Sequence, residues 1–396
     1  MVNFICLILL LLPTYLIRFS IFNIPTTALE VLIYLVFVYG LFKAKSLGFR
    51  KIPLKIILPV GLLILSLVIS VIIAPDKRIA LGEFKGFFID PLLVFWLIYQ
   101  FVKKQDLPKI FWLLILSGTF VAIHTIIQRF LGHVTTDGRV IGLFGYSPNY
   151  ISLFLAPITV LILTYNFQTT THNLPKKIWQ FVVSCLLAIV CLLAIYFSGS
   201  RGGLLAVAAG VGVFFIAYYW SWIRERISSQ IIIGILVVMA IYTGWVFFRP
   251  DFMASPDSGR VATSNNLRWQ IWQTSVELGS YHPILGVGLG NFQNAFGEMT
   301  KDRGNFPEYI TPMALTPHNI FLMFWLSLGI LGLLGFFWLL VLFFRQAFQK
   351  INSNKTACVI LAVMSSIILY GLIESSIWKN DLSIIFWVMW GLIWVI

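Results

Sequence analysis

One polar stretch, residues 248–316, interrupts a chain that otherwise consists of apolar segments long enough to cross a membrane. The chain has 396 residues, of which 59% are hydrophobic and 11% are charged. Soluble domains carry about 25% charged residues, so this composition is typical of a polytopic membrane protein. We therefore expect an all-α protein with one membrane domain over 1–396 and one large polar loop.

A window of about 20 residues, the length that a helix needs to cross the hydrocarbon core, predicts twelve membrane spans. Residues 1–22 lack the basic region and the cleavage site of a signal peptide, so we interpret them as the first span. The polar loop 248–316 falls between spans nine and ten. The predicted spans are 4–22, 27–43, 54–74, 88–102, 109–130, 148–166, 178–198, 202–220, 230–248, 317–344, 356–375 and 382–395.

The basic residues predict the orientation of these spans. Alternate loops hold fifteen of the 28 basic residues but few acidic ones, so the positive-inside rule places these loops in the cytoplasm. Both termini are then cytoplasmic and the loop 248–316 is periplasmic. The net charge of +13 is thus a topology signal and not a nucleic-acid footprint. The fifteen residues are Lys43, Lys45, Arg50, Lys51, Lys55, Lys103, Lys104, Lys109, Lys176, Lys177, Arg224, Arg226, Arg345, Lys350 and Lys355.

Metal and disulfide chemistry find no support in the pattern of cysteines and histidines. The four cysteines all lie in apolar stretches, and no Cys-x-x-Cys is present. Four of the five histidines, His124, His133, His172 and His282, are expected to be structural or solvated. No pair of histidines has the spacing of metal ligands on a helix. We expect neither a metal nor a cofactor.

Three spans begin on the predicted outer face with residues that favour helix N-termini. These starts are Ser-Pro-Asn at 147–149, Ser-Arg-Gly-Gly at 200–203 and Thr-Pro-His-Asn at 316–319. Each start presents free backbone N–H groups and the positive end of a helix dipole, so several around one cavity favour an anion, most naturally phosphate. The alternative is that they are ordinary caps at a water interface.

Two arginines also favour an anionic ligand. Arg201 lies between two nearly abutting spans, where a lone cation is costly without an anionic partner. Arg268 lies in the first turn of a predicted helix over 267–278, where a cation opposes the helix dipole unless an anion is bound. A solvated surface arginine is the alternative for Arg268.

The polar loop is predicted to contain two helices. Over 267–278, apolar residues recur at four-residue spacing, which is typical of an amphipathic helix on the membrane surface. The run Gly-x-Gly-x-Gly within 281–292 follows no strand, which excludes a dinucleotide fingerprint. We interpret it as a tight turn between the two loop helices.

His318 differs from the other histidines because we place it at the second position of a helix. A helix N-terminus disfavours the imidazolium, and a neutral imidazole can act as a general base. A structural interface histidine is the alternative.

In order and spacing, these segments resemble the O-antigen ligase and O-antigen polymerase superfamily of bacterial envelope glycosyltransferases. The predicted plan of twelve spans with one large periplasmic loop also agrees with that family. The resemblance lies in residues 199–203, 268–272, 282–292, 317–319 and 328–332, and upstream in Gly138, Arg139, Gly142, Phe144, Pro148 and Asn149.

The resemblance implies glycan transfer from an undecaprenyl-diphosphate carrier to a hydroxyl acceptor, outside the inner membrane and without a nucleotide sugar or a metal. The acceptor is a lipid A core sugar in ligases, the growing chain in polymerases and a protein in some relatives, and all three stay open. Attack opposite the diphosphate inverts the anomeric centre. His318 matches the catalytic histidine and Arg201 and Arg268 match the diphosphate-binding arginines, with Ser200, Gly202, Arg139, Asn149 and Asn319 in support. Asn319 either binds the glycan or caps its helix.

Two other classes of function are compatible with parts of the sequence. A transporter of small anions or lipid-linked glycans also suits an arginine-lined cavity. Two observations argue against a transporter. The sequence has few candidate intramembrane acids, Glu30 and Asp90 near span ends, and it has no inverted repeat of broken helices. A non-catalytic assembly protein leaves His318 and Arg201 unexplained. Glycosyl transfer is therefore the leading prediction.

Overall fold

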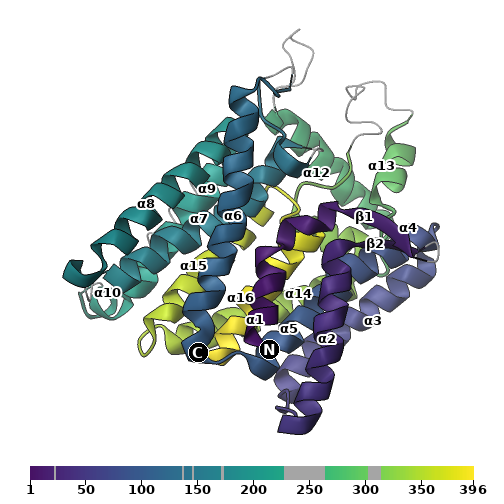
Figure 1. Cartoon of the computed structure of the whole chain (residues 1–396). Coiled ribbons are helices and arrows are strands. Elements are labelled where there is room, and N and C mark those ends of the chain that lie inside the picture. Colours follow the sequence, from purple (N-terminus) through teal and green to yellow (C-terminus); the bar gives the residue numbers. More distant parts are fainter. Residues whose placement is uncertain (22–23, 136–137, 145–146, 171–173, 227–263, 302–313) are drawn as a thin grey trace.

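The computed structural model describes the chain except for residues 22–23, 136–137, 145–146, 171–173, 227–263 and 302–313. The described helices pack into a bundle, and both chain ends lie at the end opposite to α12 and α13 (Figure 1). In chain order the elements are α1 (Val2–Leu10), η1 (Leu12–Leu16), β1 (Arg18–Ile21), β2 (Ile24–Thr27), α2 (Ala28–Leu47), α3 (Leu54–Ile73), α4 (Lys77–Glu83), η2 (Phe84–Ile89), α5 (Asp90–Phe101), η3 (Lys104–Asp106), α6 (Leu107–Phe130), η4 (Gly142–Phe144), α7 (Pro148–Thr170), α8 (Leu174–Phe197), α9 (Arg201–Tyr218), α10 (Trp220–Arg226), α12 (Ser264–Tyr281), α13 (Phe292–Thr300), α14 (Ile320–Lys350), α15 (Lys355–Gly371) and α16 (Asn380–Val395).

Among the described residues, six helices are long and apolar enough to cross a membrane, in agreement with the predicted all-α membrane protein. They are α3, α6 with its preceding turn, α7, α8, α9 and α14, while α15 and α16 are shorter apolar helices. From 27–43 onward the predicted spans coincide with helices, except 230–248, which lies outside the described residues. The total of twelve membrane spans and the extent of the loop 248–316 stay predictions.

The first predicted span, 4–22, was wrong as a continuous helix. α1 ends at Leu10, and the 3-10 turn η1 and strand β1 follow it. Pro13 lies at the start of this turn, where its ring removes the N–H that a continuing α-helix needs. β1 then pairs with β2 in an antiparallel hairpin that places Arg18 opposite Thr27. The N-terminal segment is therefore a short helix followed by a hairpin.

The helix α15 organises one side of the bundle because it packs against both α7 and α9, while α14 packs on α3 and α16 on α5. Gly210 of α9 faces the α15 residues Ala362 and Ser366, and a Cβ on it would lie 3.1 Å from the carbonyl oxygen of Ala362. Small residues of this kind let helix backbones approach closely in membranes. This contact sets the start of α9 beside the end of α15.

The helix α14 is interrupted at Gly329, whose φ of 66° is left-handed. The turn that follows α12 fills the interruption. Val287 donates its backbone N–H to the carbonyl of Leu326 over 2.6 Å, and Ile330 donates to the carbonyl of Ile284 over 3.1 Å. The loop is thereby fixed to a membrane helix through backbone groups that would otherwise be unpaired.

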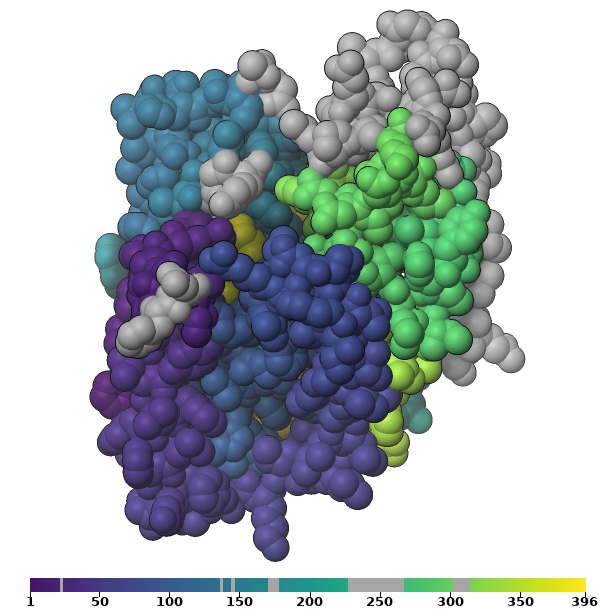
Figure 2. Space-filling model, turned by 90° about the vertical axis from the view of Figure 1, so that its right-hand side faces the viewer, coloured from purple at the N-terminus to yellow at the C-terminus, as the bar shows by residue number. Residues whose placement is uncertain are grey.

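The turn predicted over 281–292 is confirmed between α12 and α13. Gly286, Gly288 and Gly290 all have positive φ, which glycine adopts without steric cost. A Cβ on Gly288 would meet the backbone of Ala74, so the turn also packs closely on the segment after α3. In Figure 2 the green surface that includes α12 and α13 lies beside the blue helices of the N-terminal third.

We expect Gly286→Ala to lower the melting temperature of the detergent-purified protein. A Cβ on Gly286 would collide with the carbonyl of Leu326, and φ is 74° there. The left-handed backbone alone costs a side chain of order 1–3 kcal/mol. Gly297→Ala, in α13, is the matched control because its Cβ would meet open space. Equal melting of the two variants would contradict the close docking of the turn.

Candidate functional site

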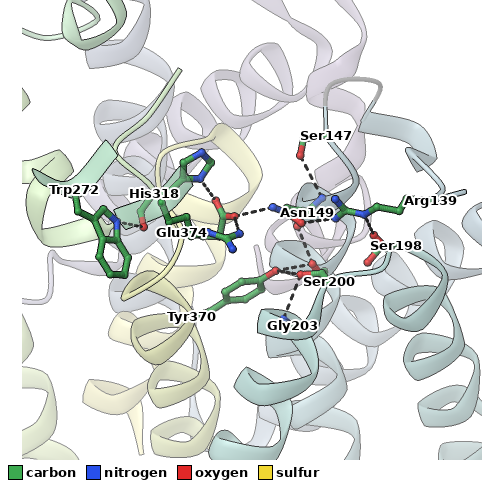
Figure 3. Close-up of polar contacts among 12 residues, drawn as sticks. Arg139, Ser147, Asn149, Ser198, Ser200, Gly203, Trp272, His318, Tyr370 and Glu374 are labelled. Carbon is green, nitrogen blue, oxygen red and sulfur yellow. Dashed lines mark hydrogen bonds and ion pairs between the residues drawn. The ribbon is translucent and has the colours of Figure 1, made fainter. Parts of the chain in front are cut away.

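A buried carboxylate, Glu374, lies at the centre of a polar cluster at the helix ends opposite to the chain termini (Figure 3). It belongs to the connection between α15 and α16. Its Oε2 lies 2.7 Å from Nδ1 of His318, and its Oε1 accepts hydrogen bonds from Arg268 over 2.8 Å and from Asn149 over 2.7 Å. One side chain thus joins α7, α12 and the segment before α14.

The network continues from Asn149 toward the start of α9. The guanidinium of Arg139 donates to Oδ1 of Asn149 over 2.7 Å and, through Nε, to the carbonyl of Ser198 over 2.7 Å. Asn149 is the second residue of α7, and Ser147 caps this helix by accepting from the N–H of Asn149. The predicted helix start at 147–149 is therefore confirmed, and Arg139 ties it to the end of α8.

The start of α9 is also confirmed where it was predicted. Ser200 is the N-cap of α9 and accepts a hydrogen bond from the N–H of Gly203. The hydroxyl of Tyr370 lies 2.6 Å from both Ser200 and Ser152, so it joins α15 to α9 and α7. A Cβ on Gly202 would collide with Ile373, which explains a glycine at the point where α9 meets the end of α15.

The charge of Glu374 follows from its partners. Burial alone raises the pKa of this carboxyl, but the charges and hydrogen bonds of His318 and Arg268 outweigh burial and lower the pKa from its ordinary 4.5 to about 2. Glu374 is therefore ionised at neutral pH. An ionised carboxylate can only accept hydrogen bonds, so Nδ1 of His318 carries a proton and Nε2 is the nitrogen that can receive one.

The predicted helix position of His318 was wrong. α14 begins at Ile320, and Asn319 is its N-cap, accepting from the N–H groups of Phe321 and Leu322. Asparagine is among the strongest N-cap residues, so the helix starts after it. His318 precedes the cap with a left-handed φ of 47°. His318 therefore lies just outside the helix, and its ring faces the carboxylate of Glu374.

Asn319 makes a second contact besides its cap. Its Nδ2 donates to the carbonyl of Leu372 over 3.0 Å, which ties the start of α14 to the end of α15. Of the two roles left open for Asn319, the structure therefore shows the cap. A part in glycan binding stays a prediction.

The two predicted diphosphate-binding arginines differ in their surroundings. Arg268 is paired with Glu374, and its side chain is only 21% exposed. α12 begins at Ser264, which puts Arg268 beyond the first turn, so the expected opposition to the helix dipole was wrong. Arg201, the first residue of α9, is exposed. Among the described contacts it has no hydrogen-bonding or ionic partner.

Arg201 lines a pocket of about 430 Å³ together with Arg129, Arg139, Gly199 and Ser200. Three guanidinium groups and the start of α9 thus border one cavity. Guanidinium groups and helix N-termini favour phosphate oxygens. No group of three residues of metal-ligating type occurs in the part of the chain that the structure describes.

Sequence reasoning missed Glu374 and Tyr370. The predicted span 356–375 contains Glu374, although the search for intramembrane acids named only Glu30 and Asp90. Glu30 is the capping-box residue of α2 and pairs with Lys85, so its role is structural. An acid at the end of an apolar span was the available signal, because such residues are costly without a function or a partner.

Comparisons with known proteins agree with the sequence resemblance. Residues 185–337 match a family model described as O-antigen ligase. A curated O-antigen ligase of Salmonella typhimurium is 24% identical over 288 residues, which cover 69% of this chain and 66% of that protein. The region matched by the family model contains Arg201, Arg268 and His318 but ends before Glu374.

We expect Glu374→Gln to lower the melting temperature at pH 7 because it leaves Arg268 without its carboxylate. Removing one partner of a buried ion pair costs about 3–5 kcal/mol. Since the folded pKa of Glu374 is depressed, its contribution is present above about pH 4.5 and is lost as the pH falls toward 2. The difference in melting temperature between Glu374→Gln and wild type should therefore become smaller as the pH falls from about 4.5 toward 2.

Glu298→Gln is the control for this comparison. Glu298 forms an exposed ion pair with Lys301, and such pairs contribute little to stability. If Glu374→Gln melted together with wild type at pH 7, the central position of Glu374 in the cluster would be refuted.

Proposed function

We propose that this chain, a member of the O-antigen ligase superfamily, transfers a glycan from an undecaprenyl-diphosphate carrier to a hydroxyl acceptor at the outer face of the inner membrane. The observation that carries the proposal is the cluster in which Glu374 holds His318 and Arg268 together. A candidate base and a candidate anion-binding group are thereby fixed in one site.

His318 is the general base in this proposal. Glu374 holds Nδ1 of the ring at 2.7 Å, which leaves Nε2 to take the proton of the acceptor hydroxyl. The acceptor oxygen then bonds to the anomeric carbon as the bond from that carbon to the phosphate oxygen breaks. Undecaprenyl diphosphate leaves, and a single displacement of this kind inverts the anomeric centre.

Arg201, with Arg139 beside it, binds the leaving diphosphate. Arg201 is exposed at the start of α9 and shares its pocket with Arg139, so both can meet phosphate oxygens. Charge that develops on the diphosphate is stabilised there by guanidinium groups and by the N-terminus of α9. The positive charge comes from the protein, so the mechanism requires no metal. Arg268 adds a further guanidinium group, which is paired with Glu374.

The favoured acceptor is a sugar of the lipid A core. Both the family model and the curated relative carry the description O-antigen ligase, which favours this branch over polymerases and protein glycosylation. The test is reconstitution of the full chain in liposomes with an undecaprenyl-diphosphate-linked glycan and rough lipopolysaccharide, in the presence of EDTA. Formation of glycan-capped lipopolysaccharide is expected, and no transfer to any acceptor would overturn the proposal.

The proposed orientation has cytoplasmic termini and a periplasmic loop over 248–316. Single cysteines at Glu298 and Asn352, both exposed, are expected to react with an impermeant maleimide from opposite sides of the inner membrane. Glu298 should be labelled from the periplasm, and Asn352 only after permeabilisation. Replacement of the four native cysteines removes the background. Labelling of Asn352 from the periplasm would refute the orientation and the location of the site.

We expect His318→Gln to lose about 10²–10⁴-fold in turnover, the usual contribution of a general base. Carrier binding should persist because the arginines are unchanged. His282→Gln is the control, since His282 is exposed in the turn after α12. A glutamine at 318 can still donate and accept hydrogen bonds, but it cannot act as a general base. Wild-type turnover by the folded His318→Gln variant would therefore mean that His318 has a structural role.

Arg201→Lys is expected to lose nearly as much turnover as Arg201→Ala, because an ammonium cannot reproduce the bidentate fork of a guanidinium. Loss of one such contact to a developing negative charge typically costs about 10²–10³-fold. Arg224→Ala, on α10, is the control for removing an exposed arginine. Full activity of Arg201→Ala would exclude Arg201 from the diphosphate site.

A further inference from the structure

A groove of about 680 Å³ runs between α12 and the start of α14. α12 lines it with one stripe of side chains at helical spacing: Trp269, Trp272, Gln273, Val276, Glu277 and Ser280. The opposite face of α12 is buried against α13 and α14 through Ile271 and Leu278. The stripe is therefore a second face of the helix, which the described core does not cover.

The α12 side of the groove has the chemistry of a sugar site, while Phe321 and Leu322 of α14 line the side across from it. Trp269 and Trp272 are half-buried, with ring centroids 6.5 Å apart, so part of each ring faces the groove. A pyranose has an apolar C–H face that packs on an aromatic ring, and a rim of hydroxyls that needs hydrogen-bonding partners. Gln273, Glu277 and Ser280 supply such partners along the same stripe.

Charge separates this groove from the arginine pocket. Among the lining residues that the structure describes, Glu277 is the ionisable one, so the groove disfavours a diphosphate. The pocket at Arg129, Arg139 and Arg201 has the opposite charge. The two cavities therefore suit different ligands: the arginine pocket suits a diphosphate, and the groove suits a group without phosphate.

The groove lies next to the segment that carries the candidate base. The indole N–H of Trp272 donates to the carbonyl of His318 over 3.3 Å, and Asn319 lies on the groove wall. In Figure 3, Trp272 lies on one side of His318, while Arg139 and Ser200 lie on the other side, beyond Glu374. A ligand in the groove would approach His318 from the side away from the arginines.

We propose that this groove binds the acceptor glycan, with a sugar ring packed on Trp269 and the acceptor hydroxyl directed toward His318. The inference rests on the proposed glycosyl transfer and adds to it the site of the second substrate. The donor diphosphate and the acceptor then meet at His318 from opposite sides, as a displacement in line requires.

The first experiment measures binding without turnover. Dephosphorylated core oligosaccharide, freed of lipid A, is titrated calorimetrically into the detergent-purified full chain. It has neither a prenyl tail nor a phosphate, so it cannot report on the carrier. We expect wild type and Trp269→Phe to bind, and Trp269→Ala and Gln273→Ala to bind about three- to tenfold more weakly. Tyr281→Ala, on the same helix but outside the groove, is the control and should match wild type.

The second experiment separates the two substrates in the reconstituted reaction. Trp269→Ala should raise the KM for rough lipopolysaccharide by a similar factor and leave the KM for the lipid-linked glycan unchanged. A rise in the donor KM alone would assign the groove to the carrier and overturn the proposal. So would equal oligosaccharide binding by wild type, Trp269→Ala and Gln273→Ala, or no binding by wild type. If wild type binds the oligosaccharide through Trp269 yet transfers nothing, the groove assignment stands and the proposed reaction fails.

Discussion

The end of this bundle that lies opposite to the chain termini depends on one ionised carboxylate in a buried position. Desolvation of Glu374 costs several kcal/mol, and the protein offsets this cost with an arginine, a histidine and an amide, each from a different segment. Because a buried charge tolerates the loss of a partner poorly, Glu374 holds these segments at fixed distances. The geometry of the site is thus a consequence of satisfying one charge.

The packing beneath the site also holds these helix ends at fixed positions. Tyr370 joins α15 to two serines on α7 and α9, and Gly202 lets the start of α9 sit against the end of α15. A site built on helix ends that are tied together in this way is more rigid than one built on loops alone. The turn after α12 adds a further tie, because its backbone fills the interruption of α14 at Gly329.

The sequence predicted the features that are local. Hydropathy located the apolar helices, and cap residues located the starts of α7 and α9, because both signals act within a few neighbouring residues. It failed at α14, where Pro317 and Asn319 both suit a helix start and the asparagine prevailed as the cap. It could not predict the partners of Glu374, because His318, Arg268 and Asn149 lie 56, 106 and 225 residues away along the chain.

The two arginines that the sequence treated as a pair are therefore not equivalent. The charge of Arg268 is largely balanced by Glu374, with which it shares a hydrogen bond of 2.8 Å. Among the described residues, Arg201 has no carboxylate partner that would neutralise its charge. Arg201 lines a pocket together with Arg129 and Arg139. A diphosphate gains most from charge that the protein has left uncompensated. For the proposed reaction, Arg201 is thus the stronger candidate for binding the leaving diphosphate, while Arg268 pairs with Glu374, which also holds His318.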